Sequence, residues 1–294
     1  MFQVFEIKYL QLKLKTDNLK QMLINCKGQL IDLTTPKVMG ILNITPNSFF
    51  DGGKYKSENE IITQVEKMLE DGATFIDIGA YSSKPNAEFV SEEEEISRIV
   101  PAVELILKKF PEALLSIDTF RSEVAKVGIE NGAAIINDIS AGGLDNKMLE
   151  TIGKYNVPYI MMHMRGNPQT MQSLTKYEDI TKELLFYFSE KVKNARSFGI
   201  NDLILDPGFG FAKTIEQNYE VLQKMELLNL LELPVLAGVS RKSMIYKTLN
   251  CTPAEALNGT SIINTIALTK GAKILRVHDV KEAMECVLMY NKIS

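Results

Sequence analysis

The feature that most constrains the fold is a series of eight short apolar runs, separated by longer segments whose apolar residues recur at helical spacing. Strands that are apolar on both faces belong to parallel sheets covered by helices. Alternation of such strands with helices predicts repeated βα units. The runs lie at residues 38–42, 74–78, 114–117, 133–136, 158–162, 203–205, 234–239 and 272–275.

Eight βα units favour an α/β fold of the closed (β/α)8 TIM-barrel type. An open sheet is disfavoured because no GxGxxG dinucleotide-binding turn follows the first run. A length of 294 residues suits one such barrel. Two short apolar stretches flank Lys27-Gly28, which predicts an N-terminal β-hairpin that plugs the bottom of the barrel. We assign residues 22–294 to one domain and expect residues 1–21 to be an extension of unknown role.

Composition excludes several classes of function. The net charge of -4 gives no global attraction to phosphate backbones or anionic lipid, so nucleic acid and membrane are not expected partners. No apolar run reaches the roughly 18 residues of a membrane helix, and no signal-peptide core is evident. Cys26, Cys251 and Cys286 are far apart and form no CxxC pair. We therefore expect reduced thiols in a cytoplasmic protein.

Polar residues follow every apolar run, at the position where the strand would end. The active sites of TIM barrels lie at the carboxyl ends of the strands, so these residues would converge on one face. Any barrel has some polar residues at its strand ends, but polar residues at all eight ends, converging on one face, indicate a site. The residues are Asn43, Ser82, Ser83, Lys84, Asp118, Asn137, His163, Asp206, Ser240, Arg241, Lys242, Arg276 and His278.

The first and last strands carry residues suited to a diphosphate. Arg276 offers a fork of donors, His278 two residues later would share its face, and Asn43 offers a neutral oxygen that can bind Mg2+. These two strands become neighbours when the barrel closes, and late strands are the usual phosphate site of the fold. A surface histidine is the commoner reading of His278 alone, but its pairing with Arg276 favours the diphosphate site.

Other strand ends suit an amino-pyrimidinone heterocycle. Asp206 could accept two N–H bonds, Asn137 could both donate and accept, and Lys242 could donate to a ring carbonyl. Asp118 would supply a second buried carboxylate facing the same ligand. From residue types alone, the paired carboxylates are equally compatible with a metal site or a general acid/base couple.

Two loops over the barrel mouth are candidate lids. Gly52-Gly53 marks the loop after the first strand, and Ser82-Ser-Lys-Pro marks the loop after the second. Ser91-Glu-Glu-Glu predicts a capping box at the start of the next helix. The acidic run from Glu92 to Glu95 is therefore interpreted as a solvated first helical turn without a metal.

The sequence resembles the dihydropteroate synthases over residues 22 to 294, through a set of short motifs in the family's order. Each tetrapeptide is weak alone, but the ordered set is specific. The motifs are Met39-Gly-Ile-Leu-Asn-Ile-Thr-Pro-Asn-Ser-Phe, Ser116-Ile-Asp-Thr, Ile135-Ile-Asn-Asp, Met162-His-Met, Asp206-Pro-Gly-Phe-Gly-Phe, Ser240-Arg-Lys-Ser and Arg276-Val-His-Asp-Val.

The resemblance implies condensation of 6-hydroxymethyl-7,8-dihydropterin diphosphate with 4-aminobenzoate, with Mg2+ as cofactor and a homodimer formed through the late helices. It implies that the carbon–oxygen bond breaks first, so that Asp118, Lys242, Arg276 and His278 act on separating charge. The implied pterin site is Asp118, Asn137, Asp206, Lys242 and Arg276. The implied diphosphate site is Asn43, Arg276 and His278, with Asn43 on the metal. The implied 4-aminobenzoate site is Ser83, Lys84, Pro85, Phe211 and Ser240.

The sequence departs from the family pattern in the two loops. Asn47, Phe50, Tyr81 and Lys84 stand where Asp, Ser, Glu and Arg are usual. Lysine keeps the charge of arginine but loses its bidentate fork, so diphosphate contacts from the second loop would weaken. The apolar surroundings of His163 favour a packing role over ligand contact.

Three other functions fit parts of the pattern. A pterin-binding methyltransferase barrel would share the carboxylate pocket but needs no diphosphate clamp. A Schiff-base aldolase would use Lys242, but the neighbouring Arg241 argues against the desolvated position that such a lysine needs. A non-catalytic pterin-binding protein would bind pterin diphosphate without turnover.

Overall fold

In the computed structural model, residues 22–44, 50–51, 54–55, 58–81 and 90–293 are described. Eight parallel strands close a barrel in the order β10-β11-β12-β3-β6-β7-β8-β9. The predicted (β/α)8 barrel is thereby confirmed. The strands are β3 (Lys37–Asn43), β6 (Phe75–Gly79), β7 (Leu114–Asp118), β8 (Ile135–Asp138), β9 (Tyr159–Met162), β10 (Leu203–Asp206), β11 (Val235–Ala237) and β12 (Ala272–Val277).

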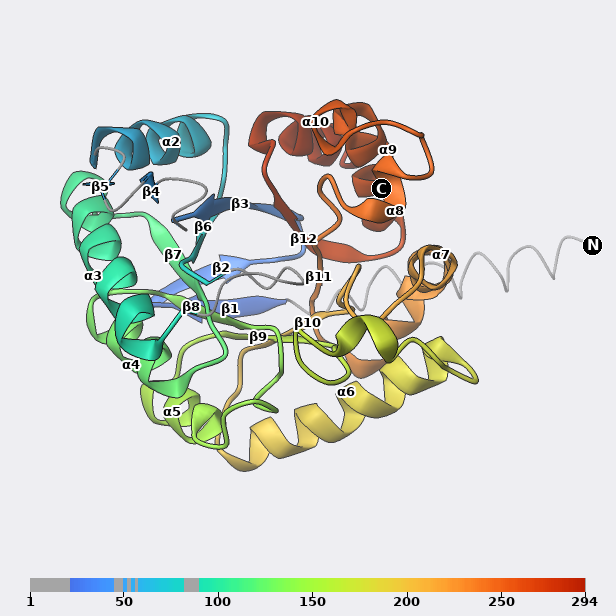
Figure 1. Ribbon diagram of the computed structural model, residues 1–294, viewed down its shortest axis with the longest axis horizontal. Helices are drawn as coiled ribbons and strands as arrows, with labels where there is room; N and C mark the ends of the chain where they lie inside the picture. The colour runs from blue at the N-terminus through green and yellow to red at the C-terminus, as the bar shows by residue number, and fades with distance from the viewer. Residues whose placement is uncertain (1–21, 45–49, 52–53, 56–57, 82–89, 294) are drawn as a thin grey trace, which may run out of the picture.

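Helices surround the strands as an outer ring (Figure 1). None of the helices in the described ranges is long and apolar enough to cross a membrane. The α-helices are α2 (Glu58–Glu70), α3 (Glu92–Lys109), α4 (Ser122–Glu130), α5 (Met148–Tyr155), α6 (Ile180–Ser197), α7 (Ile215–Lys224), α8 (Ser243–Tyr246), α9 (Leu257–Thr269) and α10 (Val280–Tyr290). Shorter elements are the 3-10 helices η1 (Met171–Ser173), η2 (Met225–Leu231) and η3 (Pro253–Glu255), and the strand pair β4 (Phe50–Asp51) and β5 (Lys54–Tyr55).

The start of α3 agrees with the prediction in one respect and corrects it in another. Ser91 caps the helix by accepting a hydrogen bond from the Glu94 amide at 3.1 Å. The acidic run is not wholly solvated, because Glu95 is fully buried and forms an ion pair with Arg121. The fourth helical residue turns toward the barrel wall, and Arg121, at the end of the strand-to-helix loop after β7, supplies the cation that makes this burial tolerable.

An N-terminal hairpin closes the bottom of the barrel, as predicted. β1 (Leu23–Cys26) and β2 (Gln29–Asp32) pair antiparallel through Lys27 and Gly28, whose φ angles of 55° and 86° match a type I′ turn. Ile24 and Ile31 belong to an apolar cluster that includes one inward-facing side chain from every barrel strand. Those eight residues are Met39, Phe75, Leu114, Ile135, Ile160, Ile204, Leu236 and Ile274.

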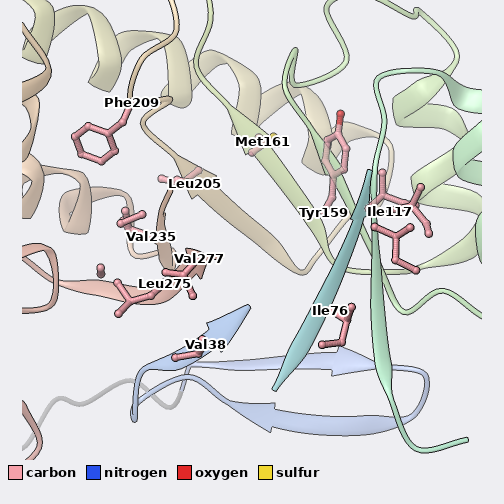
Figure 2. Close-up of a cluster of buried hydrophobic side chains, with 14 of the residues drawn as sticks. Val38, Ile76, Ile117, Tyr159, Met161, Leu205, Phe209, Val235, Leu275 and Val277 are labelled. Atoms are coloured by element: carbon pink, nitrogen blue, oxygen red, sulfur yellow. The ribbon is translucent and has the colours of Figure 1, made fainter. Parts of the chain in front are cut away.

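A second apolar core lies between the strands and the helices. Neighbouring strand residues point to opposite faces, so Val38 packs outward beside the inward Met39. Figure 2 shows other members of this outer core, among them Ile76, Ile117 and Leu275. The barrel wall is therefore apolar on both sides in its lower half.

The inner face of the barrel becomes polar above this floor. Inward side chains recur at every second residue of a strand, so the next inward layer lies two residues beyond the floor residues. On five strands this second layer is polar. Its polar members are Asp77, Ser116, Asn137, Asp206 and Arg276.

The packing of the hairpin generates a stability prediction. Ile24→Ala is expected to lower the free energy of unfolding by about 2–4 kcal/mol, because Ile24 is 3% exposed and truncation leaves a cavity in the barrel floor. Urea denaturation followed by circular dichroism measures the change. Leu30→Ala, in the same hairpin but at a side chain 64% exposed, is the control and should be near neutral. Equal losses in the two variants would contradict a hairpin packed as a plug.

Candidate active site

The centre of the polar layer is Arg276, which reaches from β12 across the barrel interior. Its Nε donates to Asp77 Oδ2 and its Nη2 donates to Asp118 Oδ2, each at 2.6 Å. Asn137 Nδ2 also donates to Asp77 Oδ2, at 3.0 Å. Side chains from β6, β7, β8 and β12 thus form one hydrogen-bonded network, and Asp77 was not among the predicted site residues.

Burial and charge pull the pKa values of this network in opposite directions. Burial raises the pKa of Asp118 to about 7; Arg276 opposes the shift, and Asp77 reinforces it. Burial alone would lower the pKa of Arg276, but Asp77 and Asp118 outweigh it and raise that pKa further. Arg276 is therefore a fixed cation, whereas the charge of Asp118 responds to its surroundings near neutral pH.

Asn43 lies beside this network at the carboxyl end of β3. Gly79 pairs in register with Asn43 on one side and Asp118 on the other. A Cβ built on Gly79 would lie 3.5 Å from Asn43 Oδ1 and 3.7 Å from Asp118 Cβ. The glycine therefore leaves open the space between the predicted diphosphate residue and the predicted pterin residue.

Asp206 and Lys242 form a second polar group at the ends of β10 and β11. A Cβ built on Gly238 would lie 3.9 Å from both Asp206 Oδ2 and Lys242 Nζ. Burial raises the pKa of Asp206, against the effect of Lys242. Burial lowers the pKa of Lys242 to about 8, against the effect of Asp206. Lys242 Nζ also donates to the Phe209 carbonyl and lies 5.1 Å from the centre of the Phe211 ring.

The prediction that Arg241 keeps Lys242 out of a desolvated position is wrong. Arg241 adopts a left-handed φ of 53° and turns away to form a bidentate ion pair with Asp279, at 2.8 and 2.9 Å. It also donates to the carbonyls of Pro253 and Ala254. Lys242 does occupy a desolvated position, so the sequence argument against a Schiff-base lysine fails in its premise.

Ser240 and His278 are joined across β11 and β12. Ser240 Oγ lies 3.0 Å from His278 Nδ1 and accepts from the His278 amide at 3.2 Å. The serine side chain is buried at 5% exposure. Ser240 thus lies against the predicted diphosphate residue, and its hydroxyl holds the orientation of the imidazole ring.

Lys213 is a second site residue that sequence reasoning missed. Its buried ammonium has three hydrogen-bonding partners, which are His163 Nδ1 at 2.9 Å, the Gly208 carbonyl at 2.9 Å and the Phe211 carbonyl at 3.0 Å. Burial lowers the pKa of Lys213 to about 7, although Asp206 opposes the shift. Three N–H groups meet three acceptors, so Lys213 fastens the loop after β10 to the end of β9.

His163 is fully buried, in agreement with its predicted packing role. Its ring meets Tyr187 edge-on, with centroids 4.8 Å apart. Burial, reinforced by Lys213, lowers the pKa of His163 to about 2. The imidazole is therefore neutral and accepts from Lys213 through Nδ1.

The remaining predicted residues divide into three groups. Phe211 is half-buried beside Lys242, whereas Phe209 belongs to the core. Tyr81 meets Phe120 edge-on at 5.3 Å and lies 5.5 Å from the guanidinium of Arg121. The predicted residues outside the described ranges are Asn47, Gly52, Gly53, Ser82, Ser83, Lys84 and Pro85, and of Phe50 only the backbone is described. The two predicted lids therefore stay predictions.

The metal-ligating side chains present suit a magnesium ion that takes most of its ligands from substrate phosphate and water. Within the described ranges, no group of three or more His, Cys, Asp or Glu side chains could hold a metal. Asn43 offers one neutral oxygen beside Gly79. Mg2+ commonly takes one or two protein oxygens and completes its shell with phosphate and water. The site fits such an ion and does not fit a metal caged by the protein alone.

Comparison with known proteins supports the resemblance seen in the sequence. The family model for pterin binding enzymes matches residues 39–278. Dihydropteroate synthase of Escherichia coli K12 is 43% identical over 263 residues, covering 89% of this chain and 93% of its own. The Synechocystis enzyme is 45% identical over 250 residues, covering 84% and 86%.

Solved structures agree in fold and sequence together. A Yersinia pestis dihydropteroate synthase in a sulfonamide drug complex matches with a TM-score of 0.87 and 40% identity, over 92% of this chain and 99% of its own. A Xanthomonas albilineans dihydropteroate synthase with 4-aminobenzoic acid matches with a TM-score of 0.86 and 33% identity, over 93% and 98%.

The contacts of Lys213 generate a second prediction. Lys213→Met is expected to lower the free energy of unfolding by about 1–3 kcal/mol, because it leaves the buried acceptors of the loop after β10 without a donor. Chemical denaturation measures the loss. Lys182→Met, at a side chain 85% exposed, is the matched control and should change stability little. A Lys213 variant as stable as the control would show that the three contacts are not maintained in solution.

Proposed function

The chain belongs to the dihydropteroate synthase family, and we propose how the residues of its barrel mouth divide the work of that reaction. The enzyme condenses 6-hydroxymethyl-7,8-dihydropterin diphosphate with 4-aminobenzoate to give 7,8-dihydropteroate and diphosphate. The observation that carries the division of roles is the convergence of Asp118, Asn137 and Arg276 in one partly buried network, joined through Asp77. A methyltransferase or an aldolase barrel would not need this arrangement beside Asn43 and His278.

The pterin is assigned to the polar layer, between the Arg276 network and the group formed by Asp206 and Lys242. Asp206 accepts N–H bonds from the 2-amino-pyrimidinone edge, and Lys242 donates to the ring carbonyl. Asn137 and Asp118 face the ring from β8 and β7, and Arg276 lies against it. The apolar floor excludes water from below, which strengthens each of these polar contacts.

The main catalytic task assigned to the protein is stabilisation of separating charges, and no protein residue is assigned to proton transfer. The bond between the pterin methylene carbon and the diphosphate oxygen breaks, and the oxygen leaves with the electron pair. The amine of 4-aminobenzoate then forms the new carbon–nitrogen bond and releases one proton to water. Asp118 and Asp206 stabilise positive charge on the pterin, while Arg276 and His278 stabilise the departing diphosphate.

Mg2+ is assigned to the diphosphate end of the site, where Asn43 would hold it. When bound, the ion neutralises negative charge on the leaving diphosphate. His278, held by Ser240 Oγ at 3.0 Å, and the fixed cation Arg276 bind and orient the same group. These residues confine the diphosphate to the β3 and β12 side of the mouth.

The 4-aminobenzoate is assigned to the side of the mouth near Phe211 and Ser240, with Ser83, Lys84 and Pro85 from the second loop. Phe211 offers a ring face, and Lys242 lies 5.1 Å from its centre. The Xanthomonas albilineans relative with 4-aminobenzoic acid supports an arylcarboxylate site in this fold.

We further propose a cytoplasmic homodimer that pairs through α9 and α10. These neighbouring helices expose several large apolar side chains, which suit burial against a second copy. The side chains are Ile262, Ile266, Leu288 and Met289, exposed by 52%, 38%, 59% and 69%. Cys26, Cys251 and Cys286 are free thiols, which supports a reducing compartment.

Diphosphate release tests the assignment of the pterin pocket. Asp206→Asn is expected to lower kcat/KM by about 100-fold or more, because it removes a charge that faces the developing cation. Release is measured with pterin diphosphate, with and without 4-aminobenzoate and Mg2+, alongside dihydropteroate formation. Asp202→Asn is the matched control, since Asp202 lies at the opposite end of the barrel against the Asn25 amide.

Three outcomes of that assay separate the possibilities. Release that needs Mg2+, yields dihydropteroate and is lost only in Asp206→Asn supports the whole assignment. Full activity in Asp206→Asn refutes the role of that carboxylate. Tight pterin binding by the wild-type protein without turnover refutes catalysis and supports the binding-protein alternative.

The lowered pKa of Lys242 generates a pH prediction. A lysine is cationic below its pKa, so a group with a pKa of about 8 loses its charge as the pH rises through 8. We expect kcat/KM for the pterin substrate to fall over that interval. Lys242→Arg keeps the charge and should remove this limb of the profile, whatever its absolute rate. Lys213 titrates in both proteins, so an unchanged limb in Lys242→Arg would assign it to another group.

A further inference from the structure

Asp77 is an ionisable residue inside an otherwise apolar strand, and none of the roles assigned above uses it directly. Its side chain is 0% exposed, whereas that of Asp118 is 23% exposed. Both of its hydrogen bonds end on Oδ2, one from Arg276 Nε at 2.6 Å and one from Asn137 Nδ2 at 3.0 Å. The carboxylate thus contacts two proposed ligand-binding residues from behind.

We propose that Asp77 is a positioning residue that fixes which atoms Asn137 and Arg276 present to the pterin diphosphate. The proposal rests on the proposed function, because it assigns a cause to the specificity of that same pocket. It makes Asp77 a determinant of substrate specificity that acts through its two neighbours.

The effect on Asn137 follows from donor and acceptor chemistry. A side-chain amide can be placed in either of two orientations, and only a partner of known polarity decides between them. Asp77 Oδ2 accepts one N–H of Asn137 Nδ2, which fixes the orientation of the amide. Asn137 Oδ1 is then fixed as the acceptor available to the ligand. The pocket therefore accepts an N–H of the pterin at this point and disfavours a ligand that offers a lone pair there.

The effect on Arg276 is geometric. Asp77 and Asp118 hold Nε and Nη2 from two different strands, which fixes the guanidinium plane. Two of its five N–H groups are committed in this way. The Nη1 group donates to no residue in the described ranges, so it is available to the diphosphate. With only one of these carboxylates, the arginine could rotate about the remaining contact.

A purely structural explanation accounts poorly for a charge at this position. Burying an ion pair has a large desolvation cost, and an apolar replacement is often as stable. Asp77 Oδ1 is buried and accepts no hydrogen bond from the described residues, which adds to that cost. A carboxylate that is expensive to keep is better explained by the orientation that it imposes on Asn137 and Arg276.

The test is Asp77→Asn, which preserves the volume of the side chain. We expect KM for pterin diphosphate to rise by about tenfold or more, because a charge-assisted contact is lost and the Asn137 amide can turn over. KM for 4-aminobenzoate should change by less than about twofold, since no contact of Asp77 reaches that side of the mouth. Calorimetric titration with 6-hydroxymethylpterin measures the corresponding loss of affinity without turnover.

Asp138→Asn is the matched control. Asp138 is also a fully buried carboxylate, but it accepts from Tyr159 and Ser140 and contacts neither Asn137 nor Arg276 through its side chain. It should lower the melting temperature while leaving both KM values near those of the wild type. If Asp77→Asn behaves in the same way, with unchanged KM values and pterin affinity, Asp77 is merely structural and the proposal is overturned.

A second background keeps the test decisive where Asp77→Asn lowers stability, because pterin titration reports only on the folded protein. Since Asp77 acts on the pterin partly through Asn137, the loss of pterin affinity caused by Asp77→Asn should be smaller in an Asn137→Ala background than in the wild-type background. Equal losses in the two backgrounds overturn the proposal. Wild-type protein that binds pterin without turnover would instead remove the proposed function and leave the titration of Asp77 variants interpretable.

Discussion

The placement of a guanidinium between two carboxylates inside the barrel governs the rest of the structure. Arg276 joins Asp77 on β6 to Asp118 on β7, so strands distant in sequence are held by one cation. Asp77 is fully buried and the other two side chains are partly buried, and charges removed from water in this way are tolerable only when each finds a partner. The neighbouring Asn137 completes the network, and the shifted pKa of Asp118 is the electrostatic result of the same arrangement.

The apolar floor and the polar layer above it are two results of one strand periodicity. Inward side chains recur every second residue, so Phe75 and Asp77 lie on the same face, as do Ile274 and Arg276. The lower layer forms a dry base closed by the hairpin. A dry base lowers the local dielectric, which makes the contacts above it stronger and any unpaired charge more costly.

Sequence reasoning predicted the architecture well because apolar runs report burial directly. It found the strand-end residues because the fold fixes where strands end. It missed Asp77 because this residue lies within a run that was interpreted as core; a charge inside such a run was the available signal. Lys213 gave no local signal, since its burial depends on His163 fifty positions earlier. The direction of Arg241 depends on a left-handed backbone angle that no sequence pattern indicates.

The hairpin that closes the barrel also sets an order of events during folding. Its turn is local and can form within about 1–10 μs. Its docking partners are remote, since Asn25 meets Asp202 and Thr34 meets Lys273 across 177 and 239 positions. At ordinary rates of synthesis, the last of these follows the hairpin by on the order of 10–50 s. The hairpin therefore leaves the ribosome before the strands that it contacts, and the contact with Lys273 cannot form before the end of that interval. Part of the apolar face of the hairpin is open to chaperones and to misassociation until then.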